Sequence, residues 1–173
     1  LWYNTHNTHT TTHSVNIPGT LLYTYYGHSE SVTTAAWSPD SKYIASASAD
    51  ATVQIWNATD GTHLYTYHGH SNEVSTVAWS PDGKLIASVG QDSTIQVWNP
   101  TDGSQIYIYR GHPSQTSAIA WSFDSKRIVA VGCEGVYVWD AVNGRNAYHY
   151  PGHTFCVYGV AWSPDGKFIA SGG

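Results

Sequence analysis

The feature that most constrains this 173-residue chain is a repeated stretch that begins with Gly-His and ends with Trp. The clearest copy runs from Gly69 to Trp98 and reads GHSNEVSTVAWSPDGKLIASVGQDSTIQVW. Variants begin at Gly27, Gly111 and Gly152, so successive copies start 42, 42 and 41 residues apart. Within each copy, short runs of alternating apolar and polar residues are separated by turn residues, which is the pattern of half-buried β-strands.

The tryptophans recur at fixed positions of the same repeat. Of the eight in the chain, four precede Ser-(Pro/Phe)-Asp, three close the third strand of a copy, and Trp2 stands where an earlier copy would close. The first group is Trp37, Trp79, Trp121 and Trp162, and the second is Trp56, Trp98 and Trp139. A period in the forties with Gly-His at one end and Trp at the other predicts the four-stranded antiparallel blades of a β-propeller. A single blade cannot cover both of its faces, so neighbouring blades are expected to stack.

Composition favours sheet and excludes several kinds of partner. Only 11% of the residues are charged, and the net charge is −5. The seven Lys and Arg are scattered along the sequence, so it shows no basic cluster that would bind nucleic acid or an anionic membrane. Two cysteines, Cys133 and Cys156, are too few for a disulfide framework, and we interpret them as unpaired thiols. The sequence shows neither a signal peptide nor an apolar run of transmembrane length, and we expect a soluble, cytoplasmic protein.

The repeats are predicted to occupy residues 21–173, after the end of a preceding repeat and an inserted Thr- and His-rich loop within residues 1–20. The closing Trp and the next Gly lie 13 residues apart in three copies but 25 apart between Trp2 and Gly27, which indicates 12 inserted residues. The blades are expected at Gly27–Tyr67, Gly69–Tyr109, Gly111–Tyr150 and, cut short, Gly152–Gly173. Their inner strands are expected at Val32–Trp37, Val74–Trp79, Thr116–Trp121 and Val157–Trp162.

The two ends of the chain fall at different points of the repeat. Leu1-Trp2 matches the end of a third strand, whereas Ser171-Gly172-Gly173 matches the end of a second. A propeller needs a closed ring, usually of 4–8 blades. We therefore expect an incomplete ring, which is either a piece of a longer array or a chain that self-associates or takes further blades from other chains.

These residues resemble the WD40 repeat, and the resemblance covers residues 21–173. It rests on the pattern GH…AWSPDGK.IAS…D.T(V/I)Q(V/I)W, which is almost whole in two copies and partial in two more. The final Trp-Asp survives only at Trp139-Asp140, because Asn57 and Asn99 follow the closing Trp of the first two copies. The resemblance implies an all-β propeller of WD40 type, whose usual role is to hold proteins or peptides, with no cofactor.

The resemblance also implies a hydrogen-bond network that runs from the Gly-His histidine to a second-strand Ser, a turn Asp and the closing Trp. An imidazole between a carboxylate and a hydroxyl lets such buried groups satisfy one another. The network residues are His28, Ser46, Asp50 and Trp56; His70, Ser88, Asp92 and Trp98; His112 and Trp139; and His153. In the third copy Ala130 and Glu134 replace the Ser and the Asp, so a weaker network is expected there.

Neither catalysis nor metal binding is predicted from these histidines. A set of His, Asp and Ser invites a hydrolase interpretation, but it recurs from blade to blade, and the chain has no G-x-S-x-G motif. His6, His9 and His13 have a spacing that could gather three imidazoles on a helix. Their Thr-rich surroundings offer no apolar face for a helix, so we expect a solvated loop and no metal site.

Ligands of the propellers that this chain resembles tend to meet the mouth of the central channel, where loops enter the inner strands. The residues expected to face a partner there are Thr33, Ala49, Ser75, Gln91, Ser117, Cys133, Phe155 and Tyr158. The set is small and neutral, which favours a peptide or loop over a highly charged ligand. Among them the aromatic Phe155 and Tyr158 are the expected apolar anchors.

Two functions remain open from the sequence. The first is a non-catalytic scaffold that binds a protein or peptide of unknown identity. The second is a regulatory or sensor module of a larger chain, for example beside a kinase or an NTPase switch domain. An enzyme is the least favoured class, because the sequence contains no phosphate-binding loop and no nucleophile motif.

Overall fold

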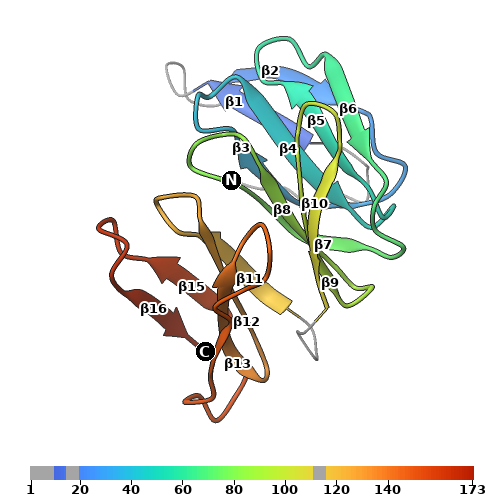
Figure 1. The fold of residues 1–173 in the computed structure, drawn as a ribbon. Coiled ribbons are helices and arrows are strands. Elements are labelled where there is room, and N and C mark those ends of the chain that lie inside the picture. The colour runs from blue at the N-terminus through green and yellow to red at the C-terminus, as the bar shows by residue number, and fades with distance from the viewer. Residues whose placement is uncertain (1–9, 15–19, 111–115) are drawn as a thin grey trace.

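The structure is a computed structural model that describes residues 10–14, 20–110 and 116–173 (Figure 1). Every regular element in these residues is a β-strand, and the predicted all-β fold class is confirmed. Sheets stand side by side like blades, and the described strands do not close a ring. Within this part of the chain, no helix is long and apolar enough to span a membrane.

Three sheets contain four antiparallel strands each, and strands that follow one another in the chain are neighbours in the sheet. The first blade consists of β3 (Val32–Trp37), β4 (Tyr43–Ser48), β5 (Val53–Asn57) and β6 (His63–Tyr67). The second consists of β7 (Val74–Trp79), β8 (Ile86–Gly90), β9 (Thr94–Trp98) and β10 (Gln105–Tyr109). The third consists of β11 (Thr116–Trp121), β12 (Arg127–Gly132), β13 (Gly135–Asp140) and β14 (Tyr148–Tyr150).

Two antiparallel pairs flank these blades: β1 (Thr10–Ser14) with β2 (Thr20–Tyr25), and β15 (Gly159–Trp162) with β16 (Ile169–Gly172). Strand β1 lies in the stretch predicted as loop, so that part of the prediction is wrong. The prediction weighed only how little the stretch could bury. Thr is β-branched and suits a strand, and β1 gains backbone pairing with β2 across a register shift between Thr12 and His13.

The inner strands of the three full blades have the predicted bounds, but the fourth begins later than expected. Strand β15 starts at Gly159 rather than Val157. The backbone N–H of Val157 donates instead to the carbonyl of Gly132 in the third blade, at 3.1 Å. This contact ties the loop before β15 to the neighbouring blade.

A Ser-x-Asp turn connects the first two strands of every blade. In the first blade, Ser38 Oγ donates to Asp40 Oδ1 at 2.6 Å and accepts from the Tyr43 N–H at 2.9 Å. Asp40 Oδ1 also accepts from the Lys42 N–H at 3.1 Å, and Ser41 takes a left-handed φ of 60°. The equivalent Ser–Asp bonds in the other blades join Ser80 to Asp82, Ser122 to Asp124 and Ser163 to Asp165.

The hydrophobic core lies between blades rather than inside any one of them. One cluster joins Val53 and Ile55 of the first blade to Val74, Ile86 and Trp98 of the second. A second cluster joins the second blade to the third, and its members include Val89, Ile95, Ile128, Ala130 and Trp139. Each sheet is therefore stabilised by the sheet next to it.

Candidate functional site

The loops of each blade gather at two opposite ends. We call the histidine end the end formed by residues 27–31, 69–73 and 152–158 together with the turns at 49–52, 91–93 and 132–135. Backbone bonds hold its parts together, since the Ala49 N–H donates to Ser31 O and the Gln91 N–H to Glu73 O, at 2.9 and 2.8 Å. The turn end is the other end, formed by residues 38–42, 57–62, 80–84 and 99–104. A binding site at either end would be built from loops on a rigid sheet scaffold.

Beneath the histidine end, the second blade carries a continuous chain of hydrogen bonds. His70 Nδ1 lies 3.0 Å from Asp92 Oδ2, and His70 Nε2 lies 2.8 Å from Ser88 Oγ. Trp98 Nε1 donates to the same Ser88 oxygen at 3.1 Å. Thr94 Oγ1 donates to Asp92 Oδ1 at 2.7 Å. The structure thus joins all four residues that the sequence groups in this copy.

The first blade repeats the arrangement. His28 Nδ1 lies 2.8 Å from Asp50 Oδ2, and His28 Nε2 lies 2.8 Å from Ser46 Oγ. Trp56 Nε1 donates to Ser46 Oγ at 3.3 Å. The side chains of His28 and His70 are both fully enclosed. The buried polar groups of the four network residues are therefore paired with one another in both blades.

In the second blade, the directions of the pKa shifts favour a neutral imidazole at His70 and an ionised carboxylate at Asp92. Burial lowers the pKa of His70, and the nearby Asp92 charge only partly opposes this effect. Burial acts to raise the pKa of Asp92, but hydrogen bonds from Thr94, Ser71 and His70 outweigh it and the net shift is downward. A neutral His70 that donates from Nδ1 to the carboxylate accepts at Nε2 from Ser88, whose oxygen is then free to accept from Trp98.

The third and fourth copies hold less of the network. Ala130 removes the hydroxyl, and no described residue accepts a hydrogen bond from the enclosed Trp139 Nε1. His112 lies outside the described residues. In the fourth copy His153 Nε2 lies 2.8 Å from Ser171 Oγ. The Ser-to-Ala replacement thus leaves one buried donor without a partner in the described part of the third blade.

Sequence reasoning missed an aromatic contact that links successive blades. Tyr67 of the first blade stacks on Trp98 of the second, with ring centroids 4.2 Å apart and planes 1° apart. Its hydroxyl donates to Gln96 Oε1 at 2.7 Å. Tyr25 on Trp56 and Tyr109 on Trp139 repeat the stacking. The sequence carries a signal for this contact: a Tyr stands two residues before each Gly-His, and in the first two copies a Gln stands two residues before the closing Trp.

The same contact explains the glycine of Gly-His. A Cβ on Gly69 would collide with the Tyr67 ring and with the side-chain oxygen of Gln96. Gln96 Nε2 also donates to the Gly69 carbonyl at 3.0 Å. The glycine is needed because an aromatic ring and an amide occupy the space of a side chain.

The residues predicted to face a partner differ in what their side chains do. Thr33 Oγ1 donates to the carbonyl of Val74 in the next blade at 2.6 Å, and Ser75 Oγ donates to Val89 O at 3.2 Å. Both hydroxyls therefore bond to backbone carbonyls of the sheets rather than facing a partner. Gln91 and Ser117 are exposed, and Ala49 is half-buried. The aromatic residues are the most open, since Phe155 is 82% and Tyr158 is 69% exposed.

The interpretation of the two cysteines as unpaired thiols is wrong. Cys133, in the turn between β12 and β13, forms a disulfide with Cys156, in the loop before β15. The two loops belong to neighbouring blades and meet at the histidine end, where the Val157–Gly132 backbone bond also lies. Counting cysteines along the chain cannot reveal this proximity, because it arises from the stacking of blades.

This arrangement offers little that a hydrolase needs. Ser88 is completely buried, and its oxygen already bonds to His70 and Trp98. A catalytic serine must be exposed to substrate beside an oxyanion hole. Among the described residues, no group of three or more His, Cys, Asp or Glu lies close enough together to hold a metal ion. The His–Ser–Trp chain thus holds the blade together.

Comparison with protein-family models finds one family repeated along the chain. The matching description is "WD domain, G-beta repeat", and the matched residues are 19–57, 61–99, 103–140 and 144–173. Together these four segments cover most of the sequence.

Proposed function

The chain belongs to the WD40 repeat family, and from this premise we propose that it is a non-catalytic scaffold that binds a peptide or protein loop at the histidine end. Repeats of this family generally serve protein interaction. The observation that carries the choice of end is the pair of exposed aromatic side chains, Phe155 and Tyr158, on a loop that a disulfide fixes. Large apolar side chains on a rigid support are typical anchors of interfaces.

The surroundings of this pair favour a segment that contributes an apolar side chain. Cys156 lies between the two aromatics in sequence and is tied to Cys133, so the loop is held before a partner arrives. Ordering that is already present in the free protein reduces the entropy lost on binding. Gln91 and Ser117, exposed at the same end, supply polar groups that could accept or donate hydrogen bonds at the edge of the contact.

Selection of peptides tests this proposal directly. A random twelve-residue peptide library on phage is panned against the full chain, and the affinities of enriched peptides are measured by fluorescence anisotropy. For peptides that bind the histidine end, Phe155→Ser combined with Tyr158→Ser should weaken binding by about tenfold or more. Phe168→Ser is the matched control, because Phe168 is 70% exposed but precedes β16 at the turn end. If no enriched peptide distinguishes the double variant from the control, the proposal fails.

A further inference from the structure

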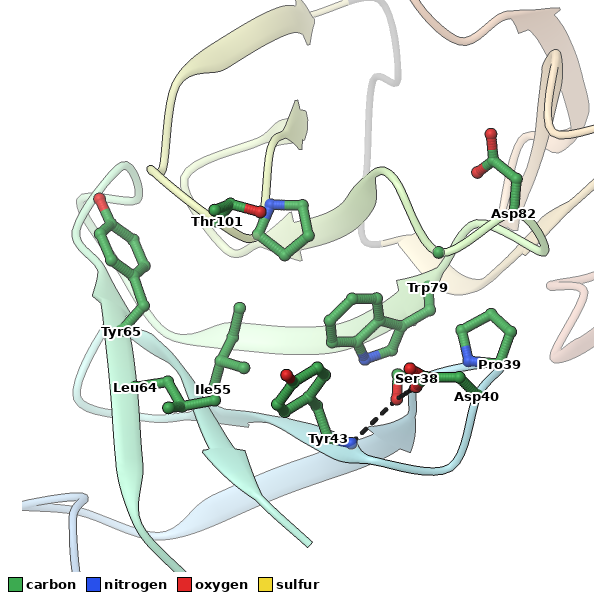
Figure 2. A pocket seen from close by; sticks show the side chains of 12 residues that line it. Ser38, Pro39, Asp40, Tyr43, Ile55, Leu64, Tyr65, Trp79, Asp82 and Thr101 are labelled. Atoms are coloured by element: carbon green, nitrogen blue, oxygen red, sulfur yellow. Dashed lines mark hydrogen bonds between the residues drawn. The ribbon is translucent and has the colours of Figure 1, made fainter.

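A groove of about 480 Å³ opens at the turn end, between the first and second blades. Figure 2 shows Leu64 and Tyr65 at one end of the groove and Pro39, Asp40 and Asp82 at the other. Trp79, from the end of the second blade's inner strand, lies between them. The volume lies in the range of sites that bind small molecules or peptide side chains. None of the residues that the sequence assigned to a partner lies in this groove.

The middle of the groove is apolar. Tyr43 and Ile55 of the first blade face Trp79 of the second there (Figure 2). Trp79 Nε1 is enclosed and has no acceptor among the described residues, so the part of the indole that borders the groove is ring carbon. Aromatic faces attract apolar groups and also cations, which lie against their π-electrons.

One end of the groove is acidic. Asp40 and Asp82 keep 48% and 41% of their side chains exposed. Hydrogen bonds from the Ser38 hydroxyl and the Lys42 N–H hold the pKa of Asp40 below its ordinary value. Burial acts to raise the pKa of Asp82, but the hydroxyl of Ser80 and neighbouring groups outweigh it and lower the pKa. Both groups are therefore ionised at neutral pH, so two carboxylates line this end of the groove.

The lysines beside these carboxylates are weak competitors for them. Lys42 Nζ lies 3.3 Å from Asp40 Oδ2, and Lys84 Nζ lies 4.0 Å from Asp82 Oδ2. Both lysine side chains are at least 70% exposed. Exposed pairs of this kind contribute little, whereas a guanidinium can form two parallel hydrogen bonds to a carboxylate. An incoming arginine can thus displace either lysine.

At the junction between the third blade and β15, an arginine of the chain itself lies over the tryptophan that corresponds to Trp79. Arg127 takes the place of Tyr43 in the repeat, and its guanidinium carbon lies 4.8 Å from the centroid of the Trp162 ring. Trp162 corresponds to Trp79. The pKa of Asp124, the counterpart of Asp40, is lowered mainly by the Ser122 hydroxyl and also by the charge of Arg127. Between the first two blades the chain supplies Tyr43 instead, and the groove stays open to an arginine from elsewhere.

We propose that the groove between the first and second blades binds an extended peptide segment in which an apolar residue is followed by an arginine. The apolar side chain packs on Trp79 and Ile55, and the guanidinium lies at the acidic end with Asp40 and Asp82. This inference rests on the proposed function as a binding scaffold, but it uses the opposite end of the blades, so variants separate the two sites.

A subtractive selection tests the groove. The same phage library is first depleted on the Asp40→Asn/Asp82→Asn variant and then enriched on the unaltered chain. Asn keeps an oxygen for the turn hydrogen bonds but removes the charge. The control is Asp124→Asn/Asp165→Asn, which removes the same number of charges from the equivalent turns elsewhere. Urea unfolding of each variant establishes that it is folded during the binding measurement.

Enriched peptides should carry an apolar residue next to an arginine and should bind the groove variant at least about tenfold more weakly than the control. Replacing their arginine with citrulline, which keeps the shape and loses the charge, should weaken binding by a similar factor. The Phe155→Ser/Tyr158→Ser variant should bind them as well as the unaltered chain does. Enrichment of peptides without arginine, equal loss on both charge variants, or no enrichment overturns the groove proposal. None of these outcomes bears on peptides that depend on Phe155 and Tyr158.

Discussion

Ser88 occupies the centre of the hydrogen-bond chain in the second blade, where its hydroxyl can donate to one neighbour and accept from the other. It donates to the neutral Nε2 of His70 and accepts from Trp98 Nε1. Removing this hydroxyl leaves two enclosed groups, His70 Nε2 and Trp98 Nε1, without this hydrogen-bond partner. A buried polar group left without a partner costs about 1–3 kcal/mol. The residue is therefore worth more to stability than its small side chain suggests.

Exchange between Ser and Ala in two blades tests this argument in both directions. Ser88→Ala should lower the free energy of unfolding by about 2–3 kcal/mol, because His70 and Trp98 both lose a partner. Ala130→Ser should raise it by up to about 1 kcal/mol, because Trp139 Nε1 gains an acceptor in the described part of the third blade. Urea unfolding followed by tryptophan fluorescence measures both. Equal destabilisation by the two changes would show that packing rather than hydrogen bonding dominates at these positions.

The protonation of His70 makes stability depend on pH. Burial lowers its pKa in the folded protein, whereas an unfolded His titrates near 6.5. Below that pH the unfolded chain takes up a proton that the folded chain resists, so the free energy of unfolding should fall as the pH drops from 7 to 5. One such group contributes at most about 1.4 kcal/mol per pH unit. The lowered pKa of Asp92 adds a loss of the same sign below about pH 4.

Urea titrations at pH 5, 6 and 7 measure this dependence, with His70→Gln as the comparison. The variant lacks the titrating group, so its free energy of unfolding should change less between pH 5 and 7 than that of the unaltered chain. A variant whose pH dependence matches that of the unaltered chain would rule out His70 as the source.

The sequence predicts the role of a residue best where that residue recurs at the same position of several repeats. His70, Ser88 and Trp98 stand at fixed places in a repeated pattern, and the structure places them within hydrogen-bond distance. The disulfide between Cys133 and Cys156 occurs once, so the repeated pattern does not predict it. It also joins two blades, and contacts of that kind depend on how blades stack rather than on spacing along the chain.

At the scale of the strand and its turn, a tyrosine of one blade packs over a glycine of the next. Gly103 and Gly166 share a φ of 69°, so alanine is strained at both positions. The two sites differ in their surroundings. A Cβ on Gly103 would meet the hydroxyl and ring of Tyr65 in the first blade, whereas a Cβ on Gly166 meets nothing within 4 Å.

Alanine at these two glycines separates backbone strain from the contact between blades. Gly166→Ala should lower the free energy of unfolding by about 1–2 kcal/mol, the cost of a left-handed conformation with a side chain. Gly103→Ala should cost more by about 1 kcal/mol, because Tyr65 must also leave its place beside Trp98. Chemical denaturation at one temperature gives both values. If the two variants lose the same amount, Tyr65 moves aside freely and contributes no link between the blades.

Most strands could be located from their turns. Ser-(Pro/Phe)-Asp segments end strands for chemical reasons, which is why β3, β7 and β11 end at the predicted residues. Strand β1 was missed because its pairing with β2 involves backbone groups, which composition does not report. Val157 was misplaced because its N–H bonds to Gly132 in another sheet.

For the molecule as a whole, the contacts between blades determine both the stability of the sheets and the shape of the groove. Trp121 Nε1 donates to Ala78 O at 3.1 Å, and the Asp82 N–H donates to Ser125 Oγ at 3.0 Å, each across a blade junction. The groove likewise takes its walls from two repeats. It could not be read from one repeat, since the decisive difference is that Tyr43 stands where Arg127 stands two blades later.

Stability should therefore be highest where a sheet is covered on both faces. Every residue of β8 and β9 in the second blade is buried. In β16, Ala170 is exposed, although the corresponding Ala87 of the second blade is fully buried, and in β15 Ala161 is exposed where Ala78 is half-buried. In stacked repeats, a unit gains its stability mainly from the faces it shares with its neighbours. Local opening should accordingly be easiest in β15 and β16.

Amide hydrogen exchange measured by mass spectrometry tests this gradient. Peptides from β8 and β9 should exchange slowest, at a rate set by global unfolding, and peptides from β15 and β16 should exchange fastest. Reducing the Cys133–Cys156 bond, which spans 23 residues, removes a constraint that a chain-entropy estimate places at about 3 kcal/mol. Because that bond anchors the loop before β15, reduction should speed exchange in β15 and β16 while β8 and β9 change little. Uniform acceleration across all sheets would instead mean that the blades unfold as one cooperative unit, with no independent step at the fourth.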